Sequence, residues 1–170
     1  MTEKIWLGGI FLKDEGGYEI ILRALAHYKK RLLKIDKSPE LKESAAMFAG
    51  ILRQAAIKTI PEIDKATEKI KSSLADPQII NDLSEDVPFL EKALISYETD
   101  LQKAQDTGHE YYLSLIGDLS KVKNDLDLIK TAKIRLRQFS WDAISPEDTN
   151  QDKESDFYTF FSFLPHYLFV

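Results

Sequence analysis

The sequence predicts an all-α protein, an elongated antiparallel helical bundle of four to five main helices with an N-terminal arm and an aromatic C-terminal tail. One observation is the stretch from Tyr112 to Phe139, where apolar residues recur in alternating steps of three and four without a proline. A second is that similar heptad-like seams run through 18–35, 39–75 and 86–105. A third is the turn-forming residues between these stretches. Each seam needs a partner helix to cover it, and a bundle supplies one.

The longest seam belongs to a helix predicted over 109–140, and the rest of the chain is expected to supply partner helices that cover it. The preceding helix is predicted over 86–105. Gly108 can adopt a left-handed conformation, and Thr107 with Glu110 forms a capping box. This pattern favours a hairpin of two helices over one continuous helix. The seam residues of the longer helix are Tyr112, Leu115, Leu119, Val122, Leu126, Ile129, Ala132, Leu136 and Phe139.

Two further helices precede this pair. The first is predicted over 18–35, and its last turns are basic, as suits the negative end of a helix dipole. Ser38 as a cap and Pro39 as the first helical residue then start a helix that reaches residue 75. Pro61 lies in its middle, and the pattern fits either one kinked helix or two helices that meet there.

The chain divides into a helical bundle domain with its N-terminal arm over 1–140, an acidic linker over 141–156 and an aromatic tail over 157–170. The arm is expected to be extended, with Trp6 packed over the bundle. The acidic linker is placed to fold back on the basic stretch 130–137.

The C-terminal tail is the candidate partner-binding segment. So dense an apolar segment is expected to be buried against its own bundle, against another protein or a second copy, or at a membrane surface. Docking in cis is slightly favoured, and the small residues of Ala45–Gly50 suggest close packing and a dock for the tail. The candidate binding residues are Phe157, Tyr158, Phe160, Phe161, Phe163, Tyr167 and Phe169.

The composition excludes several classes of protein. The chain has no cysteine, which removes disulfide scaffolds, thiolate zinc sites and cysteine nucleophiles. A net charge of −5 and a pI near 5.3 argue against a dedicated nucleic-acid binder. The apolar runs fall short of the roughly twenty residues that a membrane-spanning helix needs. Together these features predict a cytoplasmic location.

The chain shows no pattern typical of a catalytic or cofactor site. It lacks glycine-rich phosphate loops and the Gly-x-Ser-x-Gly and His-Glu-x-x-His motifs. The histidines His27, His109 and His166 fall on separate predicted elements, and none follows a glutamate by three residues. No carboxylate occupies a seam position. We therefore predict no catalytic residue, no metal site and no cofactor.

The function that these features favour is a non-enzymatic protein–protein interaction or scaffold protein, with a protein partner or a second copy bound through bundle faces and the tail. The alternative is a helical bundle that binds a small molecule or a metal and acts as an enzyme. A nucleic-acid-associated helical subunit is a third, less favoured interpretation. Two or more carboxylates and a histidine that converge in a cavity would favour the alternative.

Overall fold

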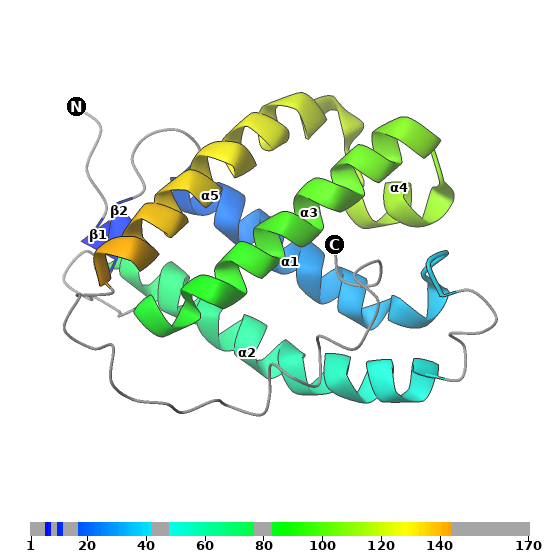
Figure 1. The fold of residues 1–170 in the computed structure, drawn as a ribbon, viewed down its shortest axis with the longest axis horizontal. Coiled ribbons are helices and arrows are strands. Elements are labelled where there is room, and N and C mark those ends of the chain that lie inside the picture. The colour runs from blue at the N-terminus through cyan, green and yellow to red at the C-terminus, as the bar shows by residue number, and fades with distance from the viewer. Residues whose placement is uncertain (1–5, 8–9, 12–16, 42–47, 77–82, 144–170) are drawn as a thin grey trace.

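The fold is the predicted all-α helical bundle, as seen in a computed structural model of the chain (Figure 1). The structure describes residues 6–7, 10–11, 17–41, 48–76 and 83–143, and it describes side chains over 18–41, 48–76 and 83–137.

Four long helices and one short helix form the described part of the bundle. They are α1 (Gly17–Leu33), α2 (Ala49–Ala75), α3 (Val87–Thr107), α4 (Glu110–Ile116) and α5 (Val122–Ala143). Short 3₁₀ turns flank them: η1 (Ile35–Lys37), η3 (Ser84–Asp86) and η4 (Leu119–Lys121). The long helices α1, α2, α3 and α5 alternate in direction, and α4 lies between α3 and α5 (Figure 1). The helix α5 ends at Ala143, slightly beyond the predicted domain end at residue 140.

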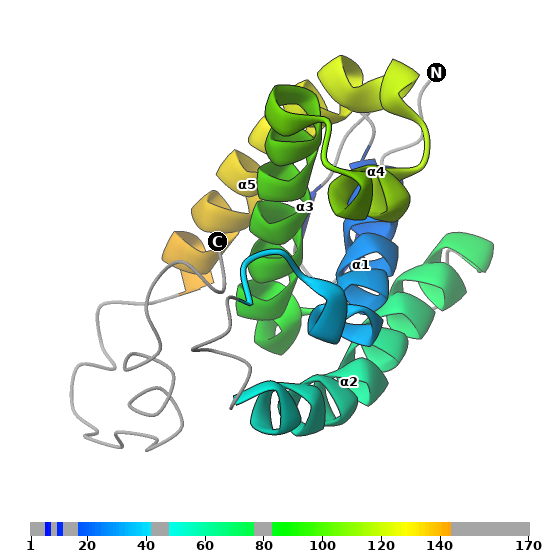
Figure 2. The ribbon, with the colours of Figure 1, turned by 90° about the vertical axis from the view of Figure 1, so that its right-hand side faces the viewer.

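The helix α1 lies at the centre of the bundle. It contacts α3 and α2 most extensively, and also α5 and α4. Figure 2 shows α2 on one side of α1, with α3 and α5 on the other. Its predicted seam is confirmed as far as Leu32, because Tyr18, Ile21, Leu25, Tyr28 and Leu32 are all buried. The last seam residue, Ile35, lies beyond the end of α1 in η1 and is partly buried. The largest fully buried side chains of the core are Ile20, Ile21, Leu25, Ile63, Ile70, Leu83, Leu90, Leu94, Leu101 and Ile129.

The N-terminal arm is extended where the structure describes it. The strands β1 (Trp6–Leu7) and β2 (Ile10–Phe11) pair antiparallel, with Trp6 opposite Phe11 and Leu7 opposite Ile10. The strand β2 contacts α5. The expected anchoring by the Trp6 side chain lies outside the described side chains.

The predicted start of the second helix at Pro39 is wrong. Residues 38–41 form a turn, in which the Leu41 N–H donates to the Ser38 carbonyl over 3.1 Å, and α2 begins at Ala49. The physical reason is Glu40, whose carboxylate is held by side chains of α1, α3 and α4, so that the chain turns instead of entering a helix.

Pro61 lies inside one continuous helix, so the structure decides between the two interpretations of 39–75 for the part that it describes. The Thr59 hydroxyl donates to the Ala55 carbonyl over 2.9 Å, one turn earlier in the same helix, so it does not cap a new helix that begins at Pro61. The structure gives no sign of the predicted close packing at Gly50, because a Cβ added there would meet no atom of the described residues within 4 Å. The rest of the predicted dock, 45–47, lies outside the described residues.

The predicted hairpin between the third and fourth helices is confirmed. Gly108 ends α3 in the left-handed conformation with φ of 61°. The cap of α4 differs from the prediction, because the Nδ1 atom of His109, and not the Thr107 hydroxyl, accepts the N–H of Tyr111 over 3.1 Å. The Thr107 hydroxyl donates back to the Lys103 carbonyl over 2.6 Å.

The prediction of one helix over 109–140 is wrong, because the chain breaks between α4 and α5. Gly117 has φ of 82°, a value that side chains with a Cβ rarely adopt. Asp118 then caps η4 by accepting the Ser120 N–H over 2.9 Å. As a result Leu119, a predicted seam residue, is 49% exposed. The apolar spacing continues through the break, so periodicity alone could not reveal it.

Candidate functional site

A cluster of polar side chains lies inside the bundle, where α1 faces α3. The helix α1 contributes Arg23, His27 and Arg31, which are four residues apart and therefore share one face. The helix α3 contributes Tyr97 and Asp100 at a spacing of three. His27, Arg31 and Asp100 are buried, and Asp100 has no exposed surface.

Asp100 is the centre of the cluster. Its Oδ1 accepts from Arg31 Nη1 over 3.0 Å, and its Oδ2 lies 3.1 Å from His27 Nε2. The same Arg31 donates through Nη1 to the Ser96 hydroxyl over 3.3 Å. Through Nη2 it donates to Glu40 Oε2 over 2.8 Å, so the guanidinium bridges two carboxylates.

Glu40 joins the turn after α1 to two further elements. Its Oε1 accepts from the ammonium of Lys103 on α3 and, over 3.1 Å, from the hydroxyl of Tyr112 on α4. Two carboxylates, Asp100 and Glu40, and two basic side chains, Arg31 and Lys103, thus pair in this part of the cluster. Ion pairs of this kind offset the cost of removing the charges from water.

A second buried carboxylate extends the cluster to α5. Asp125 is 2% exposed and accepts from Arg23 Nη1 over 2.6 Å and from the Tyr97 hydroxyl over 2.8 Å. The Tyr97 ring also contacts the His27 ring, with centroids 4.8 Å apart. We call the residues of this connected set the polar cluster: Arg23, His27, Arg31, Glu40, Ser96, Tyr97, Asp100, Lys103, Tyr112 and Asp125.

Burial shifts the titration of several of these groups. The pKa of His27 is lowered from 6.5, mainly by burial, and the nearby cations Arg31 and Lys30 add to the lowering while Asp100 opposes it. The pKa of the Tyr97 hydroxyl is raised by burial and by its hydrogen bond to Asp125. The lowered pKa of His27 thus favours the neutral imidazole in the folded protein.

Four buried polar atoms lack an aligned hydrogen bond in the described part of the chain. They are Nδ1 and Nε2 of His27, Oδ2 of Asp100 and the hydroxyl oxygen of Tyr111. Burial raises the pKa of the Tyr111 hydroxyl, which contacts the edge of the cluster near Arg31 and Ser38. Unsatisfied polar atoms of this kind are uncommon in protein interiors and mark the cluster as the least apolar part of the core.

A small cavity adjoins the cluster. Its volume is about 20 Å³, room for about one water molecule, whereas sites for small organic ligands measure about 300–1,000 Å³. It is lined by Tyr28, Arg31, Leu32, Ile35, Ser38, Glu40, Leu41 and Ser96.

The convergence of Asp100, Glu40 and His27 is the arrangement that would favour a metal-binding function. The guanidinium of Arg31, however, lies between the two carboxylates, where a metal ion would have to bind. Within the described residues no group of three or more His, Asp or Glu side chains is arranged to hold a metal ion. The absence of catalytic residues, metals and cofactors stays a prediction.

The buried carboxylates contradict the expectation that the helix seams exclude acidic residues. Asp100 follows the seam residue Tyr97 by three positions, and Asp125 follows Val122 by three. Both therefore lie on the inward face, which is wider than the single row of seam positions. The sequence contained this signal, and it was missed because only one row per helix was assigned to the interior.

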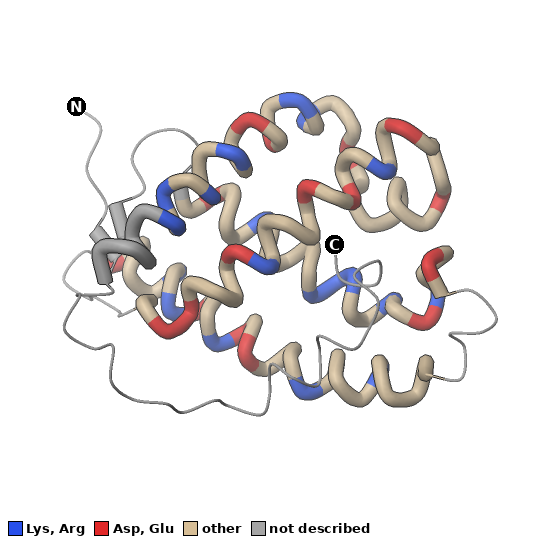
Figure 3. The backbone as a smooth tube through the Cα atoms, viewed as in Figure 1, with Lys and Arg blue, Asp and Glu red and all other residues tan. Residues whose placement is uncertain are grey.

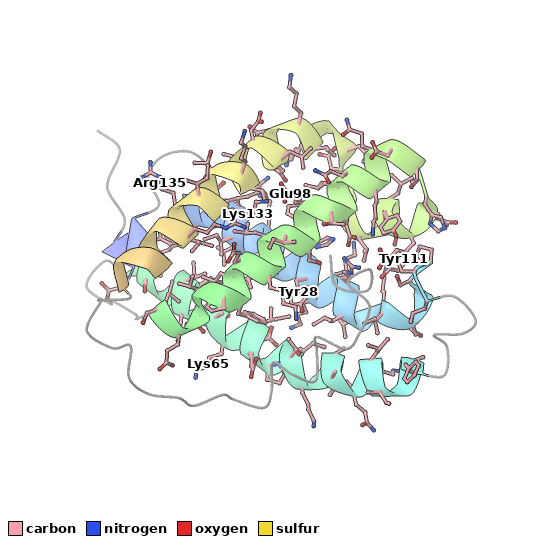
Figure 4. All side chains as sticks on the ribbon, in the orientation of Figure 1. Tyr28, Lys65, Glu98, Tyr111, Lys133 and Arg135 are labelled. Carbon is pink, nitrogen blue, oxygen red and sulfur yellow. The ribbon has the colours of Figure 1, made fainter. Side chains whose placement is uncertain are left out.

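The predicted histidines and basic stretches have structural partners. His109 caps α4, while His166 lies outside the described residues. On α5, Lys133 pairs with Glu98 of α3, and Figure 4 shows these two side chains close together. Arg137 pairs with Glu91 over 2.6 Å. The basic ends of α1 and α5 lie at opposite ends of the molecule (Figure 1), so they form no common basic surface.

A second candidate site is an exposed ridge on the first half of α2. Phe48, Ile51 and Ile57 expose 50%, 57% and 61% of their surface. With the exposed Gln54 they follow one another at intervals of three, in an inclined row that turns by about 60° around the helix at each step and winds from one side of α2 to the other. We call these four residues the α2 ridge. Such ridges pack into the grooves of neighbouring helices, but within the described residues nothing covers this one.

The charge around the α2 ridge is of one sign. Arg53 and Lys58 are exposed, and the stretch 48–61 contains no acidic residue. Figure 3 shows the first half of α2 with basic positions only, while α1, α3 and α5 carry positions of both signs. Neither Arg53 nor Lys58 forms an ion pair within the described chain. The ridge is thus an apolar surface with basic flanks.

The predicted partner-binding residues, Phe157 to Phe169, lie outside the described residues. None of the described helices is long and apolar enough to cross a membrane. Comparison with protein-family models, with curated proteins and with solved structures gave no match.

Proposed function

We propose that the protein is a non-enzymatic interaction or scaffold protein, and that its binding surface is the α2 ridge. The observation that carries this proposal is the exposure of three large apolar side chains, Phe48, Ile51 and Ile57, close together at the start of α2, beside basic residues and no acidic one. Single exposed apolar residues are common on protein surfaces, whereas several in one short segment are typical of an interface.

The chemistry of the ridge defines the partner. An apolar row with a spacing of three residues fits the groove of another helix or an aromatic segment. Arg53 and Lys58 favour acidic residues at the rim of that partner, because complementary charge speeds association and excludes basic partners. We therefore infer an acidic, apolar protein segment as the ligand.

The polar cluster supports a structural role in the same proposal. Its carboxylates are held by Arg23, Arg31 and Lys103, and its cavity has room for about one water molecule. The alternative function, a metal- or small-molecule-binding bundle, would use this cluster. Elemental analysis of the purified protein distinguishes the two, since one iron, zinc or manganese ion per chain that is lost in Asp100→Asn would favour the alternative.

The test of the proposal is capture of partners by the purified protein from its native source. We expect Ile51→Glu/Ile57→Glu to lose the captured proteins, because two carboxylates would be buried in the interface. Both positions are exposed, so the fold should tolerate the change.

The matched control is Ile134→Glu on α5, which replaces an isoleucine that is also half exposed. The Ile134→Glu variant should capture the same proteins as the wild type. Equal capture by all three proteins, or equal loss in both variants, would contradict the proposal.

A further inference from the structure

We propose that the chain's own C-terminal segment, residues 157–170, docks in cis on the α2 ridge and competes there with a protein partner. The inference rests on the proposed function in one respect, because it uses the same surface. It names the occupant of that surface in the absence of a partner.

The first argument is the chemistry of the two surfaces. The ridge presents Phe48, Ile51 and Ile57 to solvent, and a Cβ added at Gly50 beside them would meet only open space. The tail is rich in phenylalanine and tyrosine between Phe157 and Phe169. Aromatic rings suit such a surface because each buries a large apolar area with few rotatable bonds.

The segment before the tail and the first half of α2 also carry opposite charge. The segment 144–156 carries five carboxylates and one lysine, Lys153. The first half of α2 carries Arg53 and Lys58 and no acidic residue. The acidic segment and the aromatic tail therefore complement the basic and the apolar side chains, which alternate along the first half of α2, in charge and in polarity.

The basic stretch 130–137 on α5, which was the expected contact of the acidic linker, is already partly neutralised by pairs within the bundle. Lys133 already pairs with Glu98, and Arg137 with Glu91. Two of the four basic residues of 130–137 are therefore already paired, and Lys130 and Arg135 remain exposed. In the first half of α2, neither Arg53 nor Lys58 has such a partner within the described chain, and no acidic residue lies beside them.

The third argument is reach. The end of α5 and the start of α2 lie at opposite ends of the long axis (Figure 1). The thirteen residues 144–156 can extend over about 43–47 Å. The helix α2 has 27 residues and is therefore about 40 Å long. The linker is thus long enough, when extended, to bring the tail to the ridge of its own chain.

The test is disulfide crosslinking, for which the chain is suited because it has no cysteine of its own. The variant Gln54→Cys/Ser162→Cys places one thiol on the ridge and one in the tail. Both substitutions leave every apolar and basic residue of the argument unchanged. Under mild oxidation we expect a disulfide within one chain, detected by mass spectrometry of the monomer.

The matched control is Ile134→Cys/Ser162→Cys, which places the first thiol on the basic face of α5. We expect its intramolecular disulfide to form at least about tenfold more slowly, because a tethered but undocked thiol collides at the rate of a flexible chain. Adding Arg53→Glu/Lys58→Glu to the ridge pair should slow crosslinking about three- to tenfold, and high salt should have a similar effect.

Equal rates for the ridge pair and the α5 pair would overturn the inference, as would disulfides that form only between two chains. The second result would mean that the tail docks on another copy. Crosslinking is measured without a partner, so its failure leaves the capture experiment unaffected. Loss of the proposed function in the capture experiment would likewise leave the crosslinking result standing.

Discussion

Arg31 of α1 and Asp100 of α3 form an ion pair in the interior of the bundle, with 3.0 Å between Nη1 and Oδ1 and no exposed surface on the aspartate. The same guanidinium holds Glu40 of the turn after α1, so one side chain fixes α3 and this turn relative to α1. A bundle with uniform apolar seams can slide by one turn, whereas sliding here would leave the charges of Arg31 and Asp100 buried without their partners.

The first prediction concerns this pair. Asp100→Asn removes the negative charge but keeps the shape, and it leaves Arg31 with less compensation in the interior. We expect the free energy of unfolding to fall by about 3 kcal/mol, measured by urea denaturation. The control Asp106→Asn changes an exposed residue of the same helix and should shift stability by less than about 0.5 kcal/mol. Equal effects of the two substitutions would show that the pair contributes nothing specific.

The second prediction concerns pH. The folded pKa of His27 is lowered by burial, so below the unfolded value of 6.5 the unfolded chain binds a proton that the folded chain does not. The contribution of neutral His27 to the free energy of unfolding is therefore complete above pH 6.5. It decreases as the pH falls from 6.5 towards the pKa of His27 in the folded protein. The slope should approach about 1.4 kcal/mol per pH unit.

The measurement is denaturation of the wild type and of His27→Gln at several values between about pH 5 and pH 8. The groups that face His27 are Asp100, Arg31, Lys30 and Tyr97. His109 and His166 remain in both proteins and supply the common background. A wild type that parallels the variant over the whole range would refute the assignment to His27.

The third prediction compares two glycines. Gly117 has φ of 82°, and a Cβ there is strained whatever the space around it. Gly117→Ala should lower the free energy of unfolding by about 1–3 kcal/mol. Gly50→Ala, in the first turn of α2 with open space around it, should raise it by up to about 1 kcal/mol. Thermal melts of both variants check the opposite signs, and a stabilising Gly117→Ala would argue against a break between α4 and α5.

The fourth prediction concerns Pro61. It lies inside α2, where it has no N–H to donate to the carbonyl of Ile57. Pro61→Ala should keep the helical circular dichroism and raise the free energy of unfolding by about 1–2 kcal/mol, since part of the gain is lost to a more flexible unfolded chain. Pro88→Ala is the control, because Pro88 is in the first turn of α3 where no N–H is needed. Loss of soluble protein in Pro61→Ala alone would show that packing requires the proline.

Much of the fold was predictable from the sequence, because local signals and the apolar pattern agree over most of the chain. The helix α1 and its buried seam, and the hairpin at Gly108, follow from spacing and turn chemistry alone. The break at Gly117 did not follow, since the apolar spacing runs through it. The Gly117–Asp118 pair and Ser120 contained the signal of a cap, but periodicity outweighed it.

The candidate sites were less predictable than the fold. The polar cluster joins residues such as Arg23 and Asp125, which are far apart in the sequence and meet only because α1 packs beside α5. The exposure of Ile51 and Ile57 likewise depends on which side of α2 finds a partner. The sequence pattern around an isoleucine at the edge of a seam is the same whether or not a neighbouring helix covers that residue.

The sequence by itself determined the all-α class, the seams and the positions of most helices, because helix formation and apolar periodicity are local properties of a few turns. Only the tertiary structure decided that Asp100 lies in the core with Arg31, that Glu40 holds a turn where a helix start was expected, and that the α2 ridge stays open. The physical reason is that the cost of a buried charge and the covering of an apolar face depend on neighbours distant in sequence.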